Sequence, residues 1–264
     1  MLRTTRVLVG QEIAKAIRSR FSYFGPIAAV SVCVLTFMAS QKHTRVGNPN
    51  AWGYVALSMQ LAFTDIGIIF IVAFTSLLLA EEIHSGTARV VLSAPVYRRE
   101  FYLAKVAVGL LYMLLLFAIC LLASAGFAAV HYDFGGIRDV IGLVYGWREV
   151  AANLLLACVL SCISLAALVM CGVLVSVVVG KPGPAVGVAV GAVYLIDLTK
   201  HWLGLHSFVF TRYIEYPWVV FSNVAQGVSY RWTPEVWKML GLTSVYIVVP
   251  FLIGLFIFTR RDLN

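Results

Sequence analysis

The sequence predicts an all-α membrane protein whose chain crosses the bilayer six times. Of its 264 residues, 61% are hydrophobic and only 12% are charged, whereas a soluble domain carries about 25% charged residues. The apolar residues gather in six runs, each about long enough to cross a ~30 Å hydrocarbon core as a helix. No run alternates apolar and polar residues as a barrel strand would. We therefore expect one helical transmembrane domain over residues 1–264.

Residues 1–21 are expected to form an interfacial helix that lies in the membrane surface. Apolar residues recur there at helical spacing, and polar residues occupy the opposite face. The apolar positions are Val9, Ile13, Ala16 and Ile17, and the polar positions are Glu12, Lys15, Arg18 and Ser19. A basic stretch of this length and pattern favours a retained surface helix over a cleaved signal peptide.

Six membrane-spanning helices are predicted after this segment. They cover, with ends uncertain by a few residues, positions 22–39, 54–80, 106–130, 150–179, 184–199 and 239–258. The fifth run is short, and the residues that follow it as far as Leu203 can lengthen it. All five cysteines fall inside the runs, so we expect them to pack between helices and not to cross-link an outer loop.

The distribution of basic residues predicts the orientation. Segments 1–21, 81–105, 180–184 and 259–264 hold 12 of the 20 Lys and Arg residues. The positive-inside rule therefore places both termini in the cytoplasm of a cell whose plasma membrane, the inner membrane in a bacterium, contains the protein. All six tryptophans fall in the connections on the other side, where an aromatic belt is expected.

The outer connections differ in length and composition. Residues 131–149 are expected to form an outer loop. Residues 204–238 are too many for a bare loop and are rich in Phe, Tyr and Trp, so short helices that dip into the outer interface are expected before the last span.

The chain lacks the patterns of an enzyme. It contains no phosphate-binding Gly-rich loop, since Pro182 follows Gly180-Lys181, and no zinc-protease or serine-hydrolase motif. We therefore expect no catalytic residue, metal or cofactor in this chain. The net charge of +8 lies between the spans and does not form the basic stripe of a nucleic-acid reader.

The segment 81–105, which follows the second span, is the most informative part of the sequence. Gly86 permits a turn, Thr87 can cap a helix through Leu92, and Pro95 ends that helix. Residues 97–104 can form a second helix. Three cations are expected near the lipid headgroups there: Arg98, Arg99 and Lys105.

This segment resembles the permeases of the ABC type-2 exporter family. In that family the second span ends in Glu-Glu, followed by Ser-Gly-Thr, an apolar patch, Pro, Arg and a Lys that opens the third span. The matching residues are Glu81, Glu82, Ser85, Gly86, Thr87, Leu92, Pro95, Arg98 and Lys105, and the tail Arg261-Asp262-Leu263 is also similar to the family.

The resemblance implies a coupling helix over 87–95 that docks in a groove on a separate ATPase subunit. The ATPase-coupling residues would be Gly86, Thr87, Arg89, Val90, Val91, Leu92, Pro95 and Arg98. The implied assembly contains two ATPase copies, which hold ATP and Mg, and a second permease copy in a homodimer. Membrane lipid surrounds it, an outer accessory protein is an open question, and no nucleic acid is expected.

Two features inside the predicted spans are candidates for function. Asp65, beside Thr64, lies near the middle of the second span, where an ionisable group is costly and marks a candidate transport path. Gly183, Gly187 and Gly191 form a candidate close-packing face on the fifth span, either within the chain or against a second copy. A third group lies near the outer end of the fifth span, and for it a structural ion pair is favoured over a function: Asp197, Lys200 and His201.

The sequence thus predicts the permease subunit of an ATP-driven exporter that works by alternating access. Two alternatives stay open: an ATP-independent carrier that uses Asp65, and a membrane scaffold for an outer partner. The cargo is not readable, because the aromatic outer segment suits lipid, peptide or amphiphile and an interface belt equally well. Glycan cargo ranks lower, because the surface helix and the Glu-Glu-Ser-Gly-Thr motif differ from the polysaccharide-exporting branch.

Overall fold

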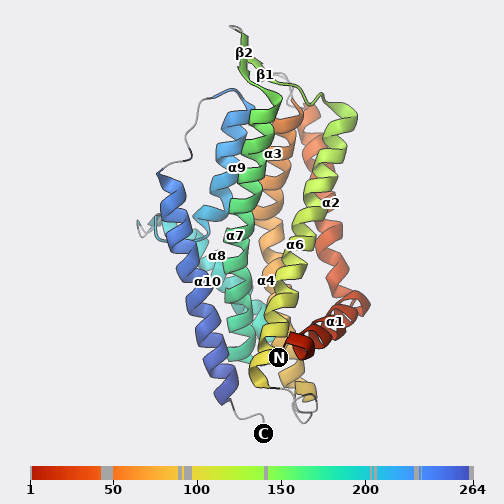
Figure 1. Cartoon of the computed structure of the whole chain (residues 1–264), viewed down its shortest axis with the longest axis vertical. Helices are drawn as coiled ribbons and strands as arrows, with labels where there is room; N and C mark the ends of the chain where they lie inside the picture. The colour runs from red at the N-terminus through yellow and green to blue at the C-terminus, as the bar shows by residue number, and fades with distance from the viewer. Residues whose placement is uncertain are drawn as a thin grey trace.

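The computed structural model describes residues 2–42, 50–88, 91, 97–139, 142–202, 204, 207–228, 232 and 234–261. Within this part of the chain, six helices are long and apolar enough to cross a membrane. They run side by side along the long axis of the molecule (Figure 1). Each contains one of the six predicted runs, so the prediction of a six-span helical bundle is confirmed at this level.

The helices are longer than the apolar runs they contain. The helical elements of the described chain, including those that do not span, are α1 Leu2–Arg18, α2 Phe21–Lys42, α3 Ala51–Leu61, η1 Ala62–Ile66, α4 Gly67–His84, α6 Arg98–His131, α7 Trp147–Val179, α8 Pro182–Trp202, α9 Arg212–Ala225 and α10 Glu235–Arg260. The second span is the continuous run of α3, the π-helical turn η1 and α4, over Ala51–His84.

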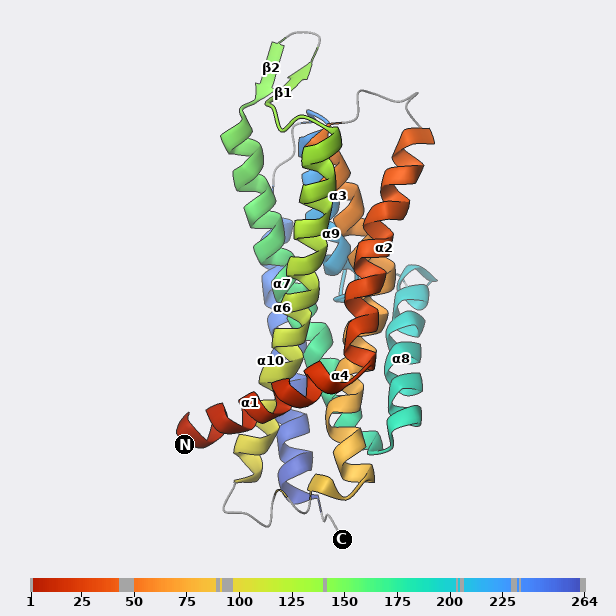
Figure 2. The ribbon, with the colours of Figure 1, turned by 90° about the vertical axis from the view of Figure 1, so that its right-hand side faces the viewer.

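The two ends of the bundle are different. We call the end where α1, the end of α4 and the end of α10 lie the terminal end. The opposite end, which carries the strands β1 (Ile137–Asp139) and β2 (Gly142–Tyr145), is the hairpin end (Figure 1). Helix α1 runs across the bundle at the terminal end, whereas the spans run along it (Figure 2).

Helices α6 and α7 are much longer than α8. They contain 34 and 33 residues, or about 50 Å at 1.5 Å per residue. Helix α8 has 21 residues, or about 32 Å, close to the ~30 Å of a hydrocarbon core. Figure 2 shows α8 beside only the part of the bundle nearer the terminal end. The bundle therefore has a six-helix part and an extension toward the hairpin end.

The core is densest where α4 meets α7. Gly172 of α7 lies against the Thr75 side chain, and a Cβ there would overlap the Thr75 hydroxyl. One turn further along, the Ser176 Oγ accepts hydrogen bonds from the backbone N–H groups of Leu79 and Ala80, at 2.9 and 2.8 Å. Small residues and hydroxyl groups draw helices together in this way inside a membrane, where water provides no drive for association.

The structure adds detail to two of the outer connections. The expected loop 131–149 contains a short antiparallel hairpin, in which Ile137 pairs with Tyr145. Helix α9, in the segment expected to dip into the interface, is buried in the bundle against α3 and α7. The Ser164 Oγ donates a hydrogen bond to the Tyr213 carbonyl oxygen at 2.9 Å and helps hold α9 there.

The tryptophans divide accordingly. Trp147 and Trp237 are exposed, as an aromatic belt requires. Trp218 is fully buried on α9, and Trp52 is buried with its Nε1 donating to the Gly135 carbonyl oxygen at 2.9 Å. The belt is therefore wrong for Trp52 and Trp218. Trp52 packs against Phe134 in the segment after α6, and Trp218 packs inside the bundle against Phe117.

Candidate functional site

The turn after α4 follows the predicted pattern. Helix α4 ends at His84, and Gly86 has φ +72°, a left-handed conformation that favours glycine. The hydroxyl groups of Ser85 and Thr87 are hydrogen-bonded at 2.9 Å. Thr87 and Ala88 are helical.

Only part of the predicted coupling segment can be placed. Arg89, Val90, Leu92 and Pro95 lie outside the described residues, so the coupling helix stays a prediction. Val91 is half-buried and packs against the main hydrophobic core. Tyr97, before α6, is 69% exposed, and Arg99 is exposed as well. Exposed side chains are therefore found at both described margins of the segment, since Ser85 and Thr87 before it are exposed as well.

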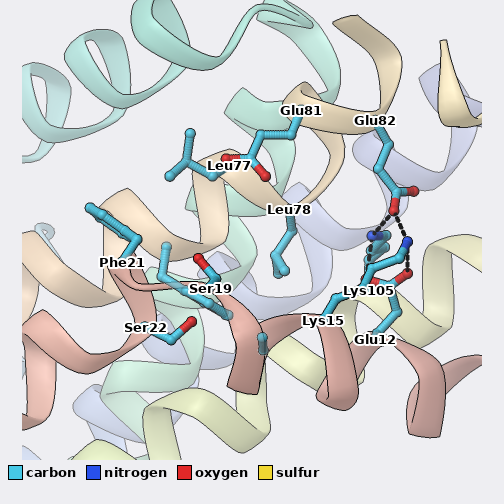
Figure 3. Close-up of a pocket in the computed structure, with 12 residues that line it drawn as sticks. Glu12, Lys15, Ser19, Phe21, Ser22, Leu77, Leu78, Glu81, Glu82 and Lys105 are labelled. Carbon is cyan, nitrogen blue, oxygen red and sulfur yellow. Dashed lines mark hydrogen bonds and ion pairs between the residues drawn. The ribbon is translucent and has the colours of Figure 1, made fainter. Parts of the chain in front are cut away.

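Four charged side chains meet beside this segment and form what we call the charge cluster: Glu12, Lys15, Glu82 and Lys105. The Lys105 Nζ lies 2.5 Å from Glu12 Oε2 and 2.8 Å from Glu82 Oε1. The Lys15 Nζ lies 2.9 Å from Glu12 Oε1 and 2.6 Å from the same Glu82 oxygen. Figure 3 shows both ammonium groups between the two carboxylates. The cluster joins α1 to the end of α4 and the start of α6.

Burial makes the cluster structurally important. The side chain of Lys105 is 2% exposed, and those of Glu12 and Glu82 are 10% and 9% exposed. A buried charge is tolerated only when it is paired, and loss of one partner costs about 3–5 kcal/mol. The start of α6 therefore depends on α1 for a counter-ion, since Glu12 is one of the two carboxylates that Lys105 contacts.

The charges also act on one another's protonation. Burial raises the pKa of the Glu12 carboxyl, but the neighbouring ammonium groups, Lys105 first, outweigh burial and hold this pKa below its usual value. Burial lowers the pKa of Lys15, and its hydrogen bonds to Glu82 and Glu12 outweigh that and raise it. Glu12 and Lys15 therefore stay ionised around neutral pH.

The predicted faces of the surface helix are partly wrong. Glu12, assigned to the polar face, is buried against the bundle. Ile17, assigned to the apolar face, is 60% exposed, as a residue that faces lipid would be. Val9 and Ala16 do pack against an apolar cluster. Charged residues of a surface helix are expected to face water, whereas here a buried lysine on α6 provides the counter-charge for Glu12.

A second set of bonds ties the helix ends together on the other side of α6. The Arg98 guanidinium donates hydrogen bonds to the carbonyl oxygens of Thr259 and Arg261, at 3.1 and 2.8 Å. Arg261 donates in turn to the Val177 carbonyl oxygen near the end of α7. Gly180, with φ +64°, ends α7 beneath the Arg261 side chain, where a Cβ would lie 2.7 Å from Nη2. Arg98 is therefore bonded within the chain.

Asp65 lies in the π-helical turn η1, on the exposed side of the bundle. The turn is closed by a hydrogen bond from the Gly67 N–H to the Ala62 carbonyl oxygen. A Cβ at Gly67 would lie 2.6 Å from that oxygen, which explains glycine at this position. The Thr64 hydroxyl is buried and has no partner among the described residues. Such single π turns are frequent at functional sites.

Helix α8 lies beside η1. The Tyr194 hydroxyl donates to the Asp65 carbonyl oxygen at 2.8 Å and links the two elements. Gly183, Gly187 and Gly191 are exposed, and no atom of the described chain lies within 4 Å of where their Cβ atoms would be. Within the described residues, no other part of the chain packs against this glycine face, and packing against a second copy stays a prediction.

The candidate ion pair at the end of α8 can be placed only in part. Asp197 is half-buried on α8, and the side chains of Lys200 and His201 lie outside the described part of the chain.

These features define the class of the protein as an α-helical membrane protein with several spans. The chain belongs to a family described as a protein of unknown function (DUF2705), whose model matches residues 20–264. Glu82 and Lys105 lie inside the matched range, and Glu12 and Lys15 precede it. No protein of curated function matches the chain.

Proposed function

We propose that this chain is the permease subunit of an ATP-driven ABC exporter, with ATP and Mg held by two copies of a separate ATPase. The observation that carries the proposal is the segment 81–105. It has the residue pattern of the exporter permeases, and it leaves and re-enters the bundle at the end where α1 and the end of α10 lie (Figure 2). Both termini would then face the cytoplasm of a cell membrane, in agreement with the distribution of Lys and Arg.

The charge cluster joins the two ends of the segment 81–105 to each other and to α1. Glu82 precedes the turn at Gly86, and Lys105 lies one turn beyond Phe101 on α6, so the two margins of the segment are held to each other through Glu82 and Lys105, at 2.8 Å. A push on the segment would therefore move α4 and α6 as a unit with α1. ATP-driven closure of the partner subunits would shift the population between two arrangements of the bundle, inward-open and outward-open.

The transport path would run along η1 and α8. Helix α4 continues directly into η1, so movement at the terminal end can reach Asp65 through one helix. The open glycine face of α8 lies on the neighbouring helix and would approach a second permease copy, as small residues allow in membranes. Asp65 and Thr64 would then face a path between two copies.

An ATP-independent carrier remains the second candidate, because one observation favours it. An acidic side chain exposed in a π turn within a span is what a proton- or cation-coupled site requires. Such a carrier would need Asp65 for transport and would work without any ATPase. A scaffold for an outer partner has no specific support from the described residues.

The test is whether an ATPase attaches through the segment 81–105. The tagged chain is purified together with a coexpressed ABC ATPase, and Mg-dependent ATP hydrolysis is measured in the eluate. Tyr97→Ala and Arg99→Glu change exposed side chains, so both variants should fold while attached ATPase falls at least fivefold. Arg98→Glu and Val91→Asp are less clean, because both residues are bonded or packed within the chain.

Arg148→Glu is the matched control, since Arg148 is an exposed cation at the start of α7, near the hairpin end. It should retain the ATPase. Wild-type levels of ATPase on the Tyr97 and Arg99 variants, or the absence of ATP hydrolysis from every eluate, would reject the exporter proposal in favour of the carrier.

A further inference from the structure

A cavity of about 100 Å³ lies at the terminal end, between α1, the start of α2, the end of α4 and α6. Its wall contains three carboxylates and two ammonium groups, which leaves one negative charge in excess: Glu12, Glu81 and Glu82 against Lys15 and Lys105. An overall acidic wall beside membrane-spanning helices is unusual and calls for a cationic occupant.

The unpaired acceptors show where the excess charge lies. Both lysines are used by Glu12 and by the Oε1 atom of Glu82. The other oxygen of Glu82, Oε2, is buried and has no partner among the described residues, on a residue that is 7% exposed. Within the same residues the carboxylate of Glu81 forms no ion pair, and in Figure 3 it points toward the leucines of the cavity wall. The Ser22 hydroxyl is also buried without a partner there.

The other half of the wall is apolar. It is formed by Ala16, Phe21, Phe74, Leu77 and Leu78. Phe21 begins the first span and α1 crosses beside it, so the apolar half faces the side where lipid chains begin in a membrane. The cavity therefore offers hydrogen-bond acceptors with negative charge at one side and an apolar surface at the other.

We propose that this cavity binds a primary ammonium group on an apolar tail, the chemistry of an aminophospholipid headgroup or of a long-chain amine. A primary ammonium has three N–H donors. The first suits the carboxylate of Glu81, and a second suits an unpaired acceptor on one side of Glu81, which is either the Glu82 Oε2 atom or the Ser22 hydroxyl. A quaternary ammonium has no donor and would leave the buried Glu82 Oε2 atom and the buried Ser22 hydroxyl unsatisfied. A volume of about 100 Å³ takes about three water-sized groups, enough for an ammonium with two carbons.

The proposal is tested on the purified full-length chain with three probes of equal chain length. These are dodecylamine, dodecyltrimethylammonium and dodecanol, with affinity measured by titration calorimetry below their micellar concentrations. Dodecylamine should bind at least tenfold more tightly than either other probe. Glu81→Gln keeps the shape of an exposed side chain and should weaken dodecylamine about tenfold, because a charge-assisted hydrogen bond is lost. Ser22→Ala should weaken it about threefold as a second variant.

Asp133→Asn removes an exposed carboxylate at the hairpin end of the bundle and is the control, with affinity expected to be unchanged. A second arm compares vesicles of phosphatidylethanolamine and phosphatidylcholine, with the retained lipid counted by native mass spectrometry. Retention of phosphatidylethanolamine that Glu81→Gln abolishes assigns the ammonium to a lipid headgroup. Binding of dodecylamine alone assigns it to a free amine.

Equal affinity for all three dodecyl probes, or equal affinity of wild type and Glu81→Gln, would overturn the proposal and leave only apolar partition. The site does not depend on an ATPase, so its failure and the failure of the exporter proposal are separate results.

Discussion

The charged side chains of the charge cluster at the terminal end are paired and mostly buried, whereas the charged side chain of Asp65, on the face formed by η1 and α8, is exposed and has no ion pair within the described chain. At the terminal end, two lysines and two glutamates form four ion pairs with N–O distances of 2.5–2.9 Å. Three of the four side chains are almost completely buried. At η1, the carboxylate of Asp65 is exposed and has no ion pair within the described chain. The paired charges fix the positions of helices, whereas the unpaired one is free to meet a ligand. The comparison separates structural charge from charge available for function.

The largest loss of stability at the terminal end is expected for Lys105→Ala. The substitution leaves Glu12 and Glu82 buried with only Lys15 between them, and the free energy of unfolding should fall by about 3–5 kcal/mol. Thermal unfolding in detergent measures the loss. A double variant with Glu12→Gln should recover part of it, because one of the two carboxylates is then neutral. Equal stability of Lys105→Ala and wild type would show that the cluster does not hold α1.

Two glycines extend the comparison to helix packing. Gly172→Ala places a methyl group against Thr75 in the α4–α7 contact and should cost about 1–3 kcal/mol through overpacking. Gly187→Ala meets open space on α8 and should stabilise the isolated chain by about 0.5–1 kcal/mol, because alanine favours helix. Unfolding curves of the two variants test this difference. A loss at Gly187 as large as that at Gly172 would mean that the α8 face is packed.

The pH dependence of α1 is a smaller effect. The folded pKa of Glu12 is lowered below 4.5, so its contribution to stability is complete above that pH and is lost as pH falls further. Hydrogen exchange over residues 5–18 should therefore be slow and constant from pH 6 to 8, after correction for intrinsic rates, and should accelerate in acid below 4.5. Acceleration that begins above pH 6 would mean that another group holds the helix.

The smallest effect on stability is expected for Asp65→Asn. The side chain is exposed and unpaired within the described residues, so unfolding should change by less than about 0.5 kcal/mol. Transport, or cargo stimulation of the ATPase, should nevertheless be lost, because the amide cannot carry a charge. Wild-type activity over a range of pH and cargo concentrations would assign Asp65 to structure.

Sequence reasoning located the spans because hydropathy depends on the chain alone. The six runs fall inside the six candidate helices, and Gly86 forms the turn expected of it. The helix ends extend further than the runs, since polar first and last turns such as Arg98–Lys105 continue the helix without being apolar.

Tertiary contacts could not be predicted in the same way. The burial of α9 and Trp218 depends on a gap between α3 and α7 that no local pattern shows. The position of Glu12 depends on Lys105, far along the chain. A signal was present in retrospect: a lysine and a glutamate flanking two spans need counter-ions, and α1 carries both signs of charge. The π turn at Asp65 has a weaker signal, the glycine at position 67.

The short apolar part of α8 has a consequence for the membrane around the protein. Its 18 residues cover about 27 Å, while the neighbouring long helices can match a thicker bilayer by exposing more of their length. Hydrophobic mismatch would therefore act most strongly on the two shortest candidate spans, Phe21–Ala39 of α2 and Pro182–Thr199 of α8, at a fraction of a kcal/mol per ångström. In a thicker, sterol-rich bilayer the lipids beside α8 would have to thin locally, or a second protein surface would have to replace them. The helix with the open glycine face is thus one of the two on which membrane thickness acts most directly.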